Sequence, residues 1–265
     1  MSKKSRDLDL WTVAGIAVVA FAIANFSHEG LGHGGACVLN GGHPLVLSSV
    51  HFECSIENRW IASGGTIANF ILAVICLLAL RAVRHSPRLR YFLWLSMTIN
   101  LLQGGGYFLF SGVGNIGDWA DVIKGLTPAW IYRVGLALLG AVTYISFVWL
   151  ALAMIKPFTG MAQPERWQRA KTLTLLPYFV GGCLYTIAGL FNPVGMVLVA
   201  ISAAAASFGG TSGLAWMWQV PRGKPPKDEP VPEPIERSRA WIIAGVVAAI
   251  IYIALLGPGI RFSRP

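Results

Sequence analysis

The stretch WTVAGIAVVAFAIANFSHEGLGHGG, residues 11–35, starts as an apolar run of membrane-spanning length and then turns polar. His28, Glu29 and His33 fall within six residues at the end of that run. An ionisable side chain at membrane depth costs about 2.5 to 3.5 kcal/mol, so such groups are usually paired, bound to a metal or placed in a wet cavity. The stretch therefore predicts a membrane helix that carries a polar site near one of its ends.

The composition of the whole chain predicts a multi-pass membrane protein. Of its 265 residues 55% are hydrophobic and 12% are charged, and the mean hydropathy is +0.60. These values exclude an ordinary soluble domain of this size. We expect an all-α polytopic transmembrane bundle of about seven helices. The predicted spans are residues 11–31, 60–80, 91–113, 129–155, 173–191, 194–219 and 241–259.

The spans and loops are expected to form a single membrane domain over residues 1–265. Within it the hydropathy and charge pattern separates four parts. They are the helices of the candidate site (1–121), further transmembrane helices (122–219), a Pro-rich cytoplasmic linker (220–240) and the last transmembrane helix (241–259).

The distribution of basic residues predicts the orientation. The net charge is +9, but the Lys and Arg residues lie in short loops and form no continuous basic patch, which argues against a nucleic-acid partner. With seven spans, sixteen of the 21 Lys and Arg residues fall on the side of the N-terminus. The positive-inside rule then places the N-terminus in the cytoplasm, with a bacterial inner membrane as the simplest setting. The alternative, a signal peptide cleaved after Ala24, would discard the helix that presents the polar site.

The same topology brings a second polar group to the depth of the first. The first and third spans both run outward, so Asp118 and Asp121 after the third span reach the outer boundary where His28, Glu29 and His33 lie. Two imidazoles and a carboxylate suit zinc, and Glu29 is then free to act as a base. The candidates for the third ligand are Asp118, Asp121, His43 and His51.

The spacing of the two histidines raises a geometric problem. Residues five apart lie about 140° from each other around a regular α-helix, whereas residues four apart differ by about 40°. Two local structures would bring His28 and His33 together. One is a π-turn with i to i+5 hydrogen bonds, and the other is a helix that ends near Gly32 so that His33 returns from the turn. The glycines around the motif make either deformation easier.

Two segments resemble the site-2 protease family of intramembrane zinc metalloproteases. HEGLGHGGACVLNGG (28–42) resembles that family's HExxH helix and Gly-Gly turn, and SGGTIANFILA (63–73) resembles its segment of small residues with an Asn. The resemblance extends over about residues 20–121. It implies that His28, His33 and Asp118 bind zinc and that Glu29 is the catalytic base.

The expected function is therefore a membrane-embedded zinc metalloprotease. Its substrate would be a membrane protein or peptide, it would act within the lipid bilayer, and its site would lie near the non-cytoplasmic face. One alternative is a zinc-dependent lipid amidase of the ceramidase type, and another is a metal transporter or sensor without hydrolysis. A purely structural role, with Glu29 and His33 as a hydrogen-bonded pair at i and i+4, is a further alternative.

Two more expectations concern residues near the motif. Cys37 and Cys54 share one loop and can form a disulfide if that loop faces an oxidising compartment. Asn69, Asn100 and Gln103 lie inside apolar spans. We expect them to join helices by hydrogen bonds, and support of a metal ligand or binding of a substrate strand are the alternatives.

Overall fold

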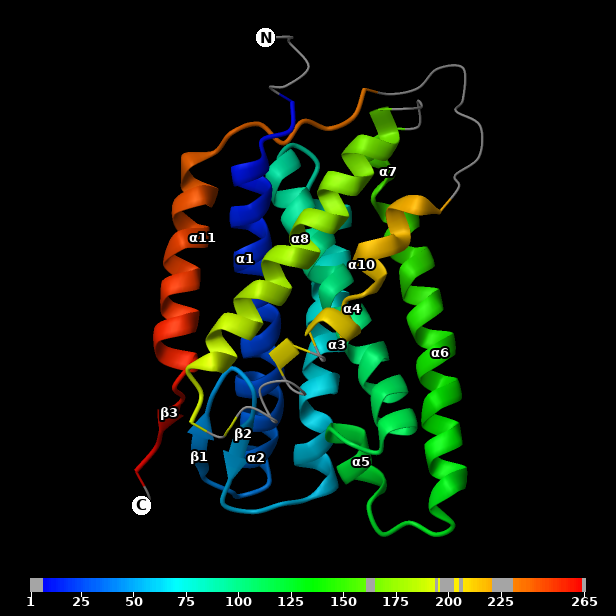
Figure 1. Cartoon of the computed structure of the whole chain (residues 1–265), viewed down its shortest axis with the longest axis vertical. Coiled ribbons are helices and arrows are strands. Elements are labelled where there is room, and N and C mark those ends of the chain that lie inside the picture. The colour runs from blue at the N-terminus through cyan, green and yellow to red at the C-terminus, as the bar shows by residue number, and fades with distance from the viewer. Residues whose placement is uncertain are drawn as a thin grey trace.

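Long helices, arranged side by side along the longest axis of the molecule, form the scaffold (Figure 1). The computed structural model describes residues 7–160, 165–193, 195, 203, 204, 207–220 and 231–263. Its long helices are α1 (Leu10–Phe26), α3 (Arg59–Ala82), α4 (Pro87–Gly114), α6 (Ala129–Met154), α8 (Glu165–Leu190) and α11 (Arg239–Ile251). The shorter ones are η2 (Ser27–Gly34), α2 (Gly35–Leu39), α5 (Asp118–Ile123), α7 (Lys156–Thr159), α10 (Gly213–Trp216), η4 (Met217–Gln219) and η5 (Tyr252–Leu256).

Five helices among the described residues are long and apolar enough to cross a membrane. They are Leu10–Leu39, Arg59–Ala82, Ala129–Met154, Glu165–Leu190 and Arg239–Leu256. This finding is consistent with a multi-pass membrane protein, as the composition predicts. The count of seven is not confirmed.

The two other predicted spans differ from the five for separate reasons. The span 91–113 lies within α4, a helix of 28 residues whose amide side chains and glycines lower its hydropathy. The span 194–219 falls partly outside the described residues. Its described end forms the short helices α10 and η4.

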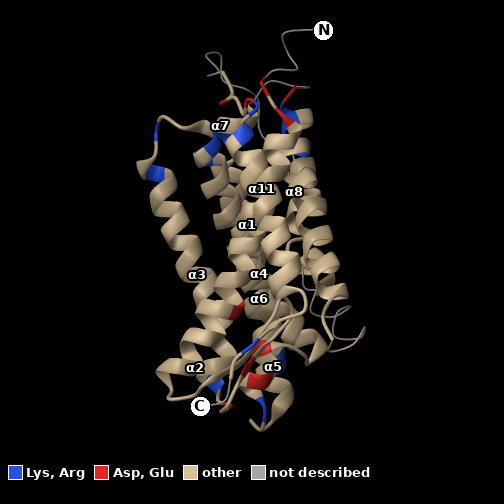
Figure 2. Cartoon of the chain, turned by 90° about the vertical axis from the view of Figure 1, so that its left-hand side faces the viewer, with Lys and Arg blue, Asp and Glu red and all other residues tan. Residues whose placement is uncertain are grey.

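The polar ends of the bundle differ in charge. Figure 2 shows that most Lys and Arg residues gather at the end where α1 begins, and that the middle of the bundle is nearly free of charged residues. The strand β3 (Ile260–Arg261) lies at the opposite end, beside β1 (Pro44–Leu47) and β2 (Phe52–Cys54) (Figure 1). The asymmetry is the one that the positive-inside rule uses. The cytoplasmic location of the N-terminus stays a prediction.

The helix α4 lies at the centre of the packing. Trp94 is fully buried and its indole N–H donates a hydrogen bond to the carbonyl of Ala151 in α6, at 3.0 Å. Tyr91 is fully buried as well, and its hydroxyl donates to the carbonyl of Leu173 in α8, at 2.8 Å. Protein therefore surrounds the inner length of α4, which explains how this helix tolerates buried polar side chains.

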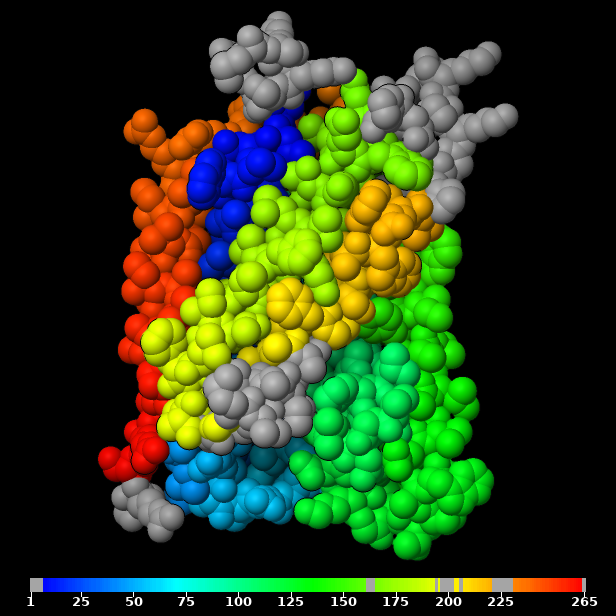
Figure 3. Space-filling view, viewed as in Figure 1, coloured from blue at the N-terminus to red at the C-terminus, as the bar shows by residue number. Residues whose placement is uncertain are grey.

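Glycines allow two pairs of helices to approach closely. A Cβ atom added to Gly32 would lie 2.6 Å from the carbonyl oxygen of Gly64, so η2 and α3 meet backbone to backbone. In the same way, a Cβ atom on Gly245 of α11 would lie 2.5 Å from the Cα atom of Gly15 in α1. On its other side α1 is covered by α8, which lies across its lower part in the space-filling view (Figure 3). The first contact matters most for function because it sets the distance between the motif helix and α3.

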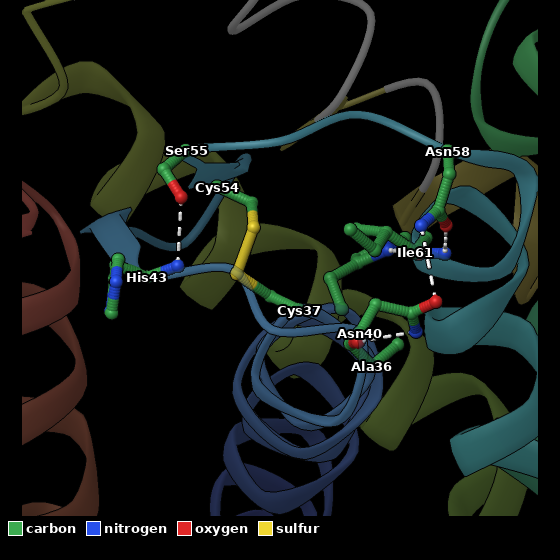
Figure 4. Close-up of a disulfide and its surroundings, with 9 residues drawn as sticks. Ala36, Cys37, Asn40, His43, Cys54, Ser55, Asn58 and Ile61 are labelled. Atoms are coloured by element: carbon green, nitrogen blue, oxygen red, sulfur yellow. Dashed lines mark hydrogen bonds between the residues drawn. A yellow bond between two sulfur atoms is a disulfide. The ribbon is translucent and has the colours of Figure 1, made fainter.

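A small antiparallel sheet departs from the all-α expectation. Its strand order is β2-β1-β3, so the C-terminal strand β3 returns to pair with β1. A disulfide between Cys37 and Cys54 joins α2 to β2, with the two Cα atoms 6.0 Å apart (Figure 4). Strands of two to four residues lie at or below the shortest length at which a sequence pattern indicates a strand. The sequence therefore indicated the disulfide but not the sheet.

Candidate metal centre

The two histidines of the motif lie on one face because the helix is locally a π-helix. The element η2 runs without a break from α1 into α2, and i to i+5 hydrogen bonding brings residues five apart back above one another. The Nε2 atoms of His28 and His33 are 3.3 Å apart. The expected π-turn is thus confirmed. The alternative of a helix ending near Gly32 is wrong, since helical structure continues to Leu39.

A glycine of α3 leaves room beside both imidazoles. A Cβ atom on Gly65 would lie 2.5 Å from Cε1 of His28 and 2.6 Å from Nε2 of His33. Real Cβ atoms do not approach other atoms so closely, and both rings are held by hydrogen bonds. The position therefore admits only glycine while the histidines keep their places.

The segment that follows α4 delivers the third candidate ligand. The helix α4 ends at Gly114 with Asn115 as its C-cap, and the chain turns through Gly117, whose φ of 82° favours glycine, before α5 starts at Asp118. The indole of Trp119 donates a hydrogen bond to the hydroxyl of Thr66 in α3, at 3.0 Å. This bond ties α5 to α3 next to Gly65, and so fixes the position of Asp118.

The carboxylate of Asp118 reaches both histidines. Its Oδ2 atom lies 3.2 Å from Nε2 of His28 and 3.5 Å from Nε2 of His33. This oxygen is buried and, among the described residues, has no partner in hydrogen-bond geometry. Burial disfavours the charged carboxylate, but the imidazoles of His33 and His28, when protonated, outweigh this effect and hold the pKa of Asp118 below its usual value.

The hydrogen bond of Nδ1 of His33 leaves its Nε2 atom available as a metal ligand. Its Nδ1 atom lies 2.7 Å from the carbonyl oxygen of Ile61. A carbonyl oxygen can only accept, so Nδ1 carries the proton. In the neutral ring, Nε2 then presents a lone pair toward His28 and Asp118, which is the state that binds a metal.

A chain of amide hydrogen bonds fixes the tautomer of His28 in the same way. The Nδ2 atom of Asn100 donates to the carbonyl of Ser96, at 2.8 Å, so Oδ1 of Asn100 must accept from Nδ2 of Asn69, at 2.7 Å. The Oδ1 atom of Asn69 therefore faces His28 and accepts from its Nδ1, at 2.7 Å. The expected hydrogen bond between helices is confirmed, and the same residues support His28.

The separations of the three candidate ligand atoms are close to those found around a tetrahedral metal ion. They form a triangle with sides of 3.2, 3.3 and 3.5 Å. In a tetrahedral zinc site with ligand distances of about 2.0 to 2.2 Å, neighbouring ligand atoms lie about 3.3 to 3.6 Å apart. Two imidazoles also disfavour Mg²⁺ and Ca²⁺, which prefer oxygen ligands. His28, His33 and Asp118 thus form a group that could hold a metal ion.

The other candidates for the third ligand do not join this group. His43 and Asp121 are exposed. His51 is held elsewhere, because its Nδ1 atom lies 2.9 Å from the hydroxyl of Ser48 and its Nε2 atom lies 3.2 Å from the carboxylate of Glu53. Among the described residues, the cluster of potential ligands consists of His28, His33 and Asp118 alone.

The cluster opens into a cavity of about 950 Å³, which we call the main cavity. Glu29 is buried, with 6% of its surface exposed, and lines this cavity together with His33 and Asp118. The alternative in which Glu29 and His33 form a pair is wrong, since Nδ1 of His33 bonds Ile61 and its Nε2 faces His28 and Asp118. The carboxylate of Glu29 is therefore placed beside the cluster and is not one of its ligands.

Two residues of the site escaped the sequence reasoning. The ring of Tyr107 stacks on the imidazole of His28, with the ring centres 4.8 Å apart and the planes 15° from parallel. Gly65 lies beside both histidines. The pair Gly64-Gly65 was visible as a small-residue segment, but nothing in the sequence indicated which of its residues faces the motif helix.

Comparison with known proteins finds no matching family model, no matching curated protein and no matching solved structure.

Proposed function

We propose that this protein is a membrane-embedded, zinc-dependent hydrolase that cleaves peptide bonds of membrane-associated substrates. The observation that carries the proposal is the triangle of ligand atoms from His28, His33 and Asp118, with sides of 3.2 to 3.5 Å, beside the buried carboxylate of Glu29. A tetrahedral site with three protein ligands leaves its fourth position for water or substrate, as catalytic zinc sites do.

The residues divide the chemistry between them. Zinc, when bound, would lower the pKa of a water and polarise the scissile carbonyl. The carboxylate of Glu29 accepts the proton of the attacking water and passes it to the leaving amine. Because their Nδ1 atoms donate to Asn69 and Ile61, His28 and His33 can present Nε2 to a metal as neutral ligands. The main cavity gives the substrate access from the polar end of the bundle.

The proposed relation to site-2 proteases depends on sequence segments and on the arrangement of the site. The supporting features are the HEGLGH segment, which supplies two histidines and a glutamate, and the aspartate that follows the helix α4. The histidine spacing in this chain is one residue longer, and η2 offsets the extra residue.

We further propose that the site lies near the non-cytoplasmic face of a bacterial inner membrane. The end of the bundle that holds the site also holds the disulfide and the smaller share of Lys and Arg residues (Figure 2). Disulfides persist in oxidising compartments, and the positive-inside rule assigns the basic end to the cytoplasm. Both arguments favour the same side for the site.

Metal analysis combined with a hydrolysis assay tests the proposal. The purified wild type is expected to hold one zinc per chain and to cleave a degenerate peptide library, and a chelator should abolish cleavage. The variants His28→Ala, His33→Ala and Asp118→Ala should each lose zinc, whereas Asp121→Asn should keep it. Stoichiometric zinc without hydrolysis would favour the transporter or sensor, and a wild type without bound metal would reject the proposal.

A lipid amide is the second candidate substrate. The same chemistry cleaves an amide in a peptide or in a lipid. The observation in favour of the lipid is an apolar cavity between α4 and α6 that shares Tyr107 with the main cavity.

By contrast, transport requires ligands along a path through the membrane, and the described residues hold such a cluster at one end only.

A further inference from the structure

A second cavity of about 520 Å³ adjoins the site, and we call it the side cavity. Its walls come from α4, from α6 and from the segment just before α10. Tyr144 of α6 holds that segment in place, because its hydroxyl lies 3.0 Å from the hydroxyl of Ser212 and accepts a hydrogen bond from the backbone N–H of Gly213, at 2.8 Å. The side cavity is therefore built by specific contacts between described elements.

The two cavities share part of their walls. Tyr107 and Phe110, one turn apart on α4, line both of them. Tyr107 also stacks on His28, so one aromatic ring separates the side cavity from a proposed metal ligand. A substrate whose amide lies beside His33 and Asp118 in the main cavity can thus place a neighbouring group in the side cavity.

Glycines form part of the wall of the side cavity. Gly106, Gly114, Gly209 and Gly210 all line it. Among the described residues, a Cβ atom on Gly209 would meet no atom within 4 Å, and its backbone lies outside the left-handed region. The cavity is thus space that no side chain of the described residues fills. An apolar group placed there would gain the van der Waals contacts that the walls now lack.

The main cavity has a different character. Exposed carboxylates of Glu53, Glu57 and Asp121 line it, together with Arg59 and Lys124. Charged walls suit the polar backbone and flanking residues of a peptide, and a cavity of about 950 Å³ accommodates several of them. The acyl chain of a lipid would gain nothing from such walls. The pair of cavities therefore fits a peptide with one large apolar side chain beside the bond that is cut.

We infer that the side cavity is the specificity pocket for a large apolar side chain of the peptide substrate, adjacent to the scissile bond. The inference rests on the proposed peptidase function and names the substrate class of the same site. Apolar pockets separate side chains by size, and one methylene changes the specificity about 10-fold or more. Peptides with Leu or Phe at this position should thus exceed those with Ala by at least about 10-fold in kcat/KM.

Filling the cavity from Gly209 tests the inference. The variant Gly209→Phe should keep its zinc and its melting temperature but lose the preference for large apolar side chains in a degenerate peptide library analysed by mass spectrometry. The matched control is Gly135→Phe on α6, because Gly135 is exposed, lines neither cavity and also leaves a Cβ atom free of contacts within the described chain. If Gly209→Phe loses zinc or fails to fold, Gly209→Leu takes its place.

A binding measurement separates failure of the inference from failure of the proposed function. In the Glu29→Gln background, a fluorescent peptide with Phe at its centre should bind at least about 10-fold more tightly than the same peptide with Ala there, and Gly209→Phe should remove the difference. Equal affinities, or an unchanged preference in Gly209→Phe, would overturn the inference. Cleavage of an N-palmitoyl amino acid that Gly209→Phe blocks would assign the cavity to an acyl chain instead. If the wild type hydrolyses neither substrate, the proposed function fails, and the binding difference alone decides on the cavity.

Discussion

The carboxylate of Glu29 lies beside the cluster of His28, His33 and Asp118 but is not one of its candidate ligands. It lines the main cavity beside His33 and Asp118, and the three ligand atoms come from other residues. We expect Glu29→Gln to retain zinc and to lower kcat by about 10²-fold to 10⁴-fold, because the amide cannot take a proton from water. Zinc content and single-turnover hydrolysis of the library peptide would be measured together. Asp121→Asn, a change at another acidic residue of the same cavity, should keep zinc and lower the rate of hydrolysis far less than Glu29→Gln does. Full activity of Glu29→Gln would refute the assigned role.

The hydrogen bonds behind His28 also predict a measurable effect. Asn69→Leu removes the acceptor of the Nδ1 proton, so the ring loses its fixed tautomer and orientation. Loss of such a partner typically lowers metal affinity about 10-fold to 100-fold. Competition with a chromophoric chelator would measure the affinity. Gln103→Leu is the matched control, since this buried amide bonds Tyr185 at 3.4 Å and touches neither histidine. An unchanged zinc affinity in Asn69→Leu would show that the amide chain only joins α3 to α4.

At the scale of elements, the site depends on how α3 meets η2. Gly65→Ala would put a Cβ atom 2.6 Å from Nε2 of His33, and both rings are held from behind. We expect this variant to lose most of its zinc while the helices stay assembled, as helical content by circular dichroism would show. The control is Gly35→Ala, whose Cβ atom meets nothing among the described residues within 4 Å. Since Gly35 is helical, this change should keep zinc and stabilise the fold by about 0.5 to 1 kcal/mol. Normal zinc binding by Gly65→Ala would contradict the observed packing.

The elements also show what the sequence could and could not predict. His28, Glu29, His33 and Asp118 were found from sequence because charged groups at membrane depth are conspicuous, and hydropathy brings them to one boundary. The π-helix was one of two predicted solutions to the spacing. The contact between Gly32 and Gly64 was not predictable, because an apolar helix in an apolar solvent carries no periodic signal for its buried face.

The helix α4 shows that hydropathy alone can also miss a long helix of the bundle. Its polar residues lower its hydropathy below that of the five candidate spans, although it is the most deeply surrounded of the long helices. Hydropathy reports contact with lipid, and α4 contacts mainly protein through residues such as Trp94 and Tyr91. The hydrogen bond from Asn69 to Asn100 was predictable in kind, yet the partner and the direction of the bond required the structure.

For the whole molecule, the strongest prediction concerns orientation. The helix α1 begins at the basic end, and β3 lies at the end with the site and the disulfide (Figures 1 and 2). Moving the basic end across a membrane is opposed by the positive-inside rule, and the disulfide would not persist in the cytoplasm. In a bacterial host, alkaline phosphatase fused after residue 263 should therefore be active. A fluorescent protein that matures only in the cytoplasm should be dark when fused after residue 263 and bright when fused before Leu8. The exchanged pattern would place the site on the cytoplasmic side and would restrict its substrates to that face.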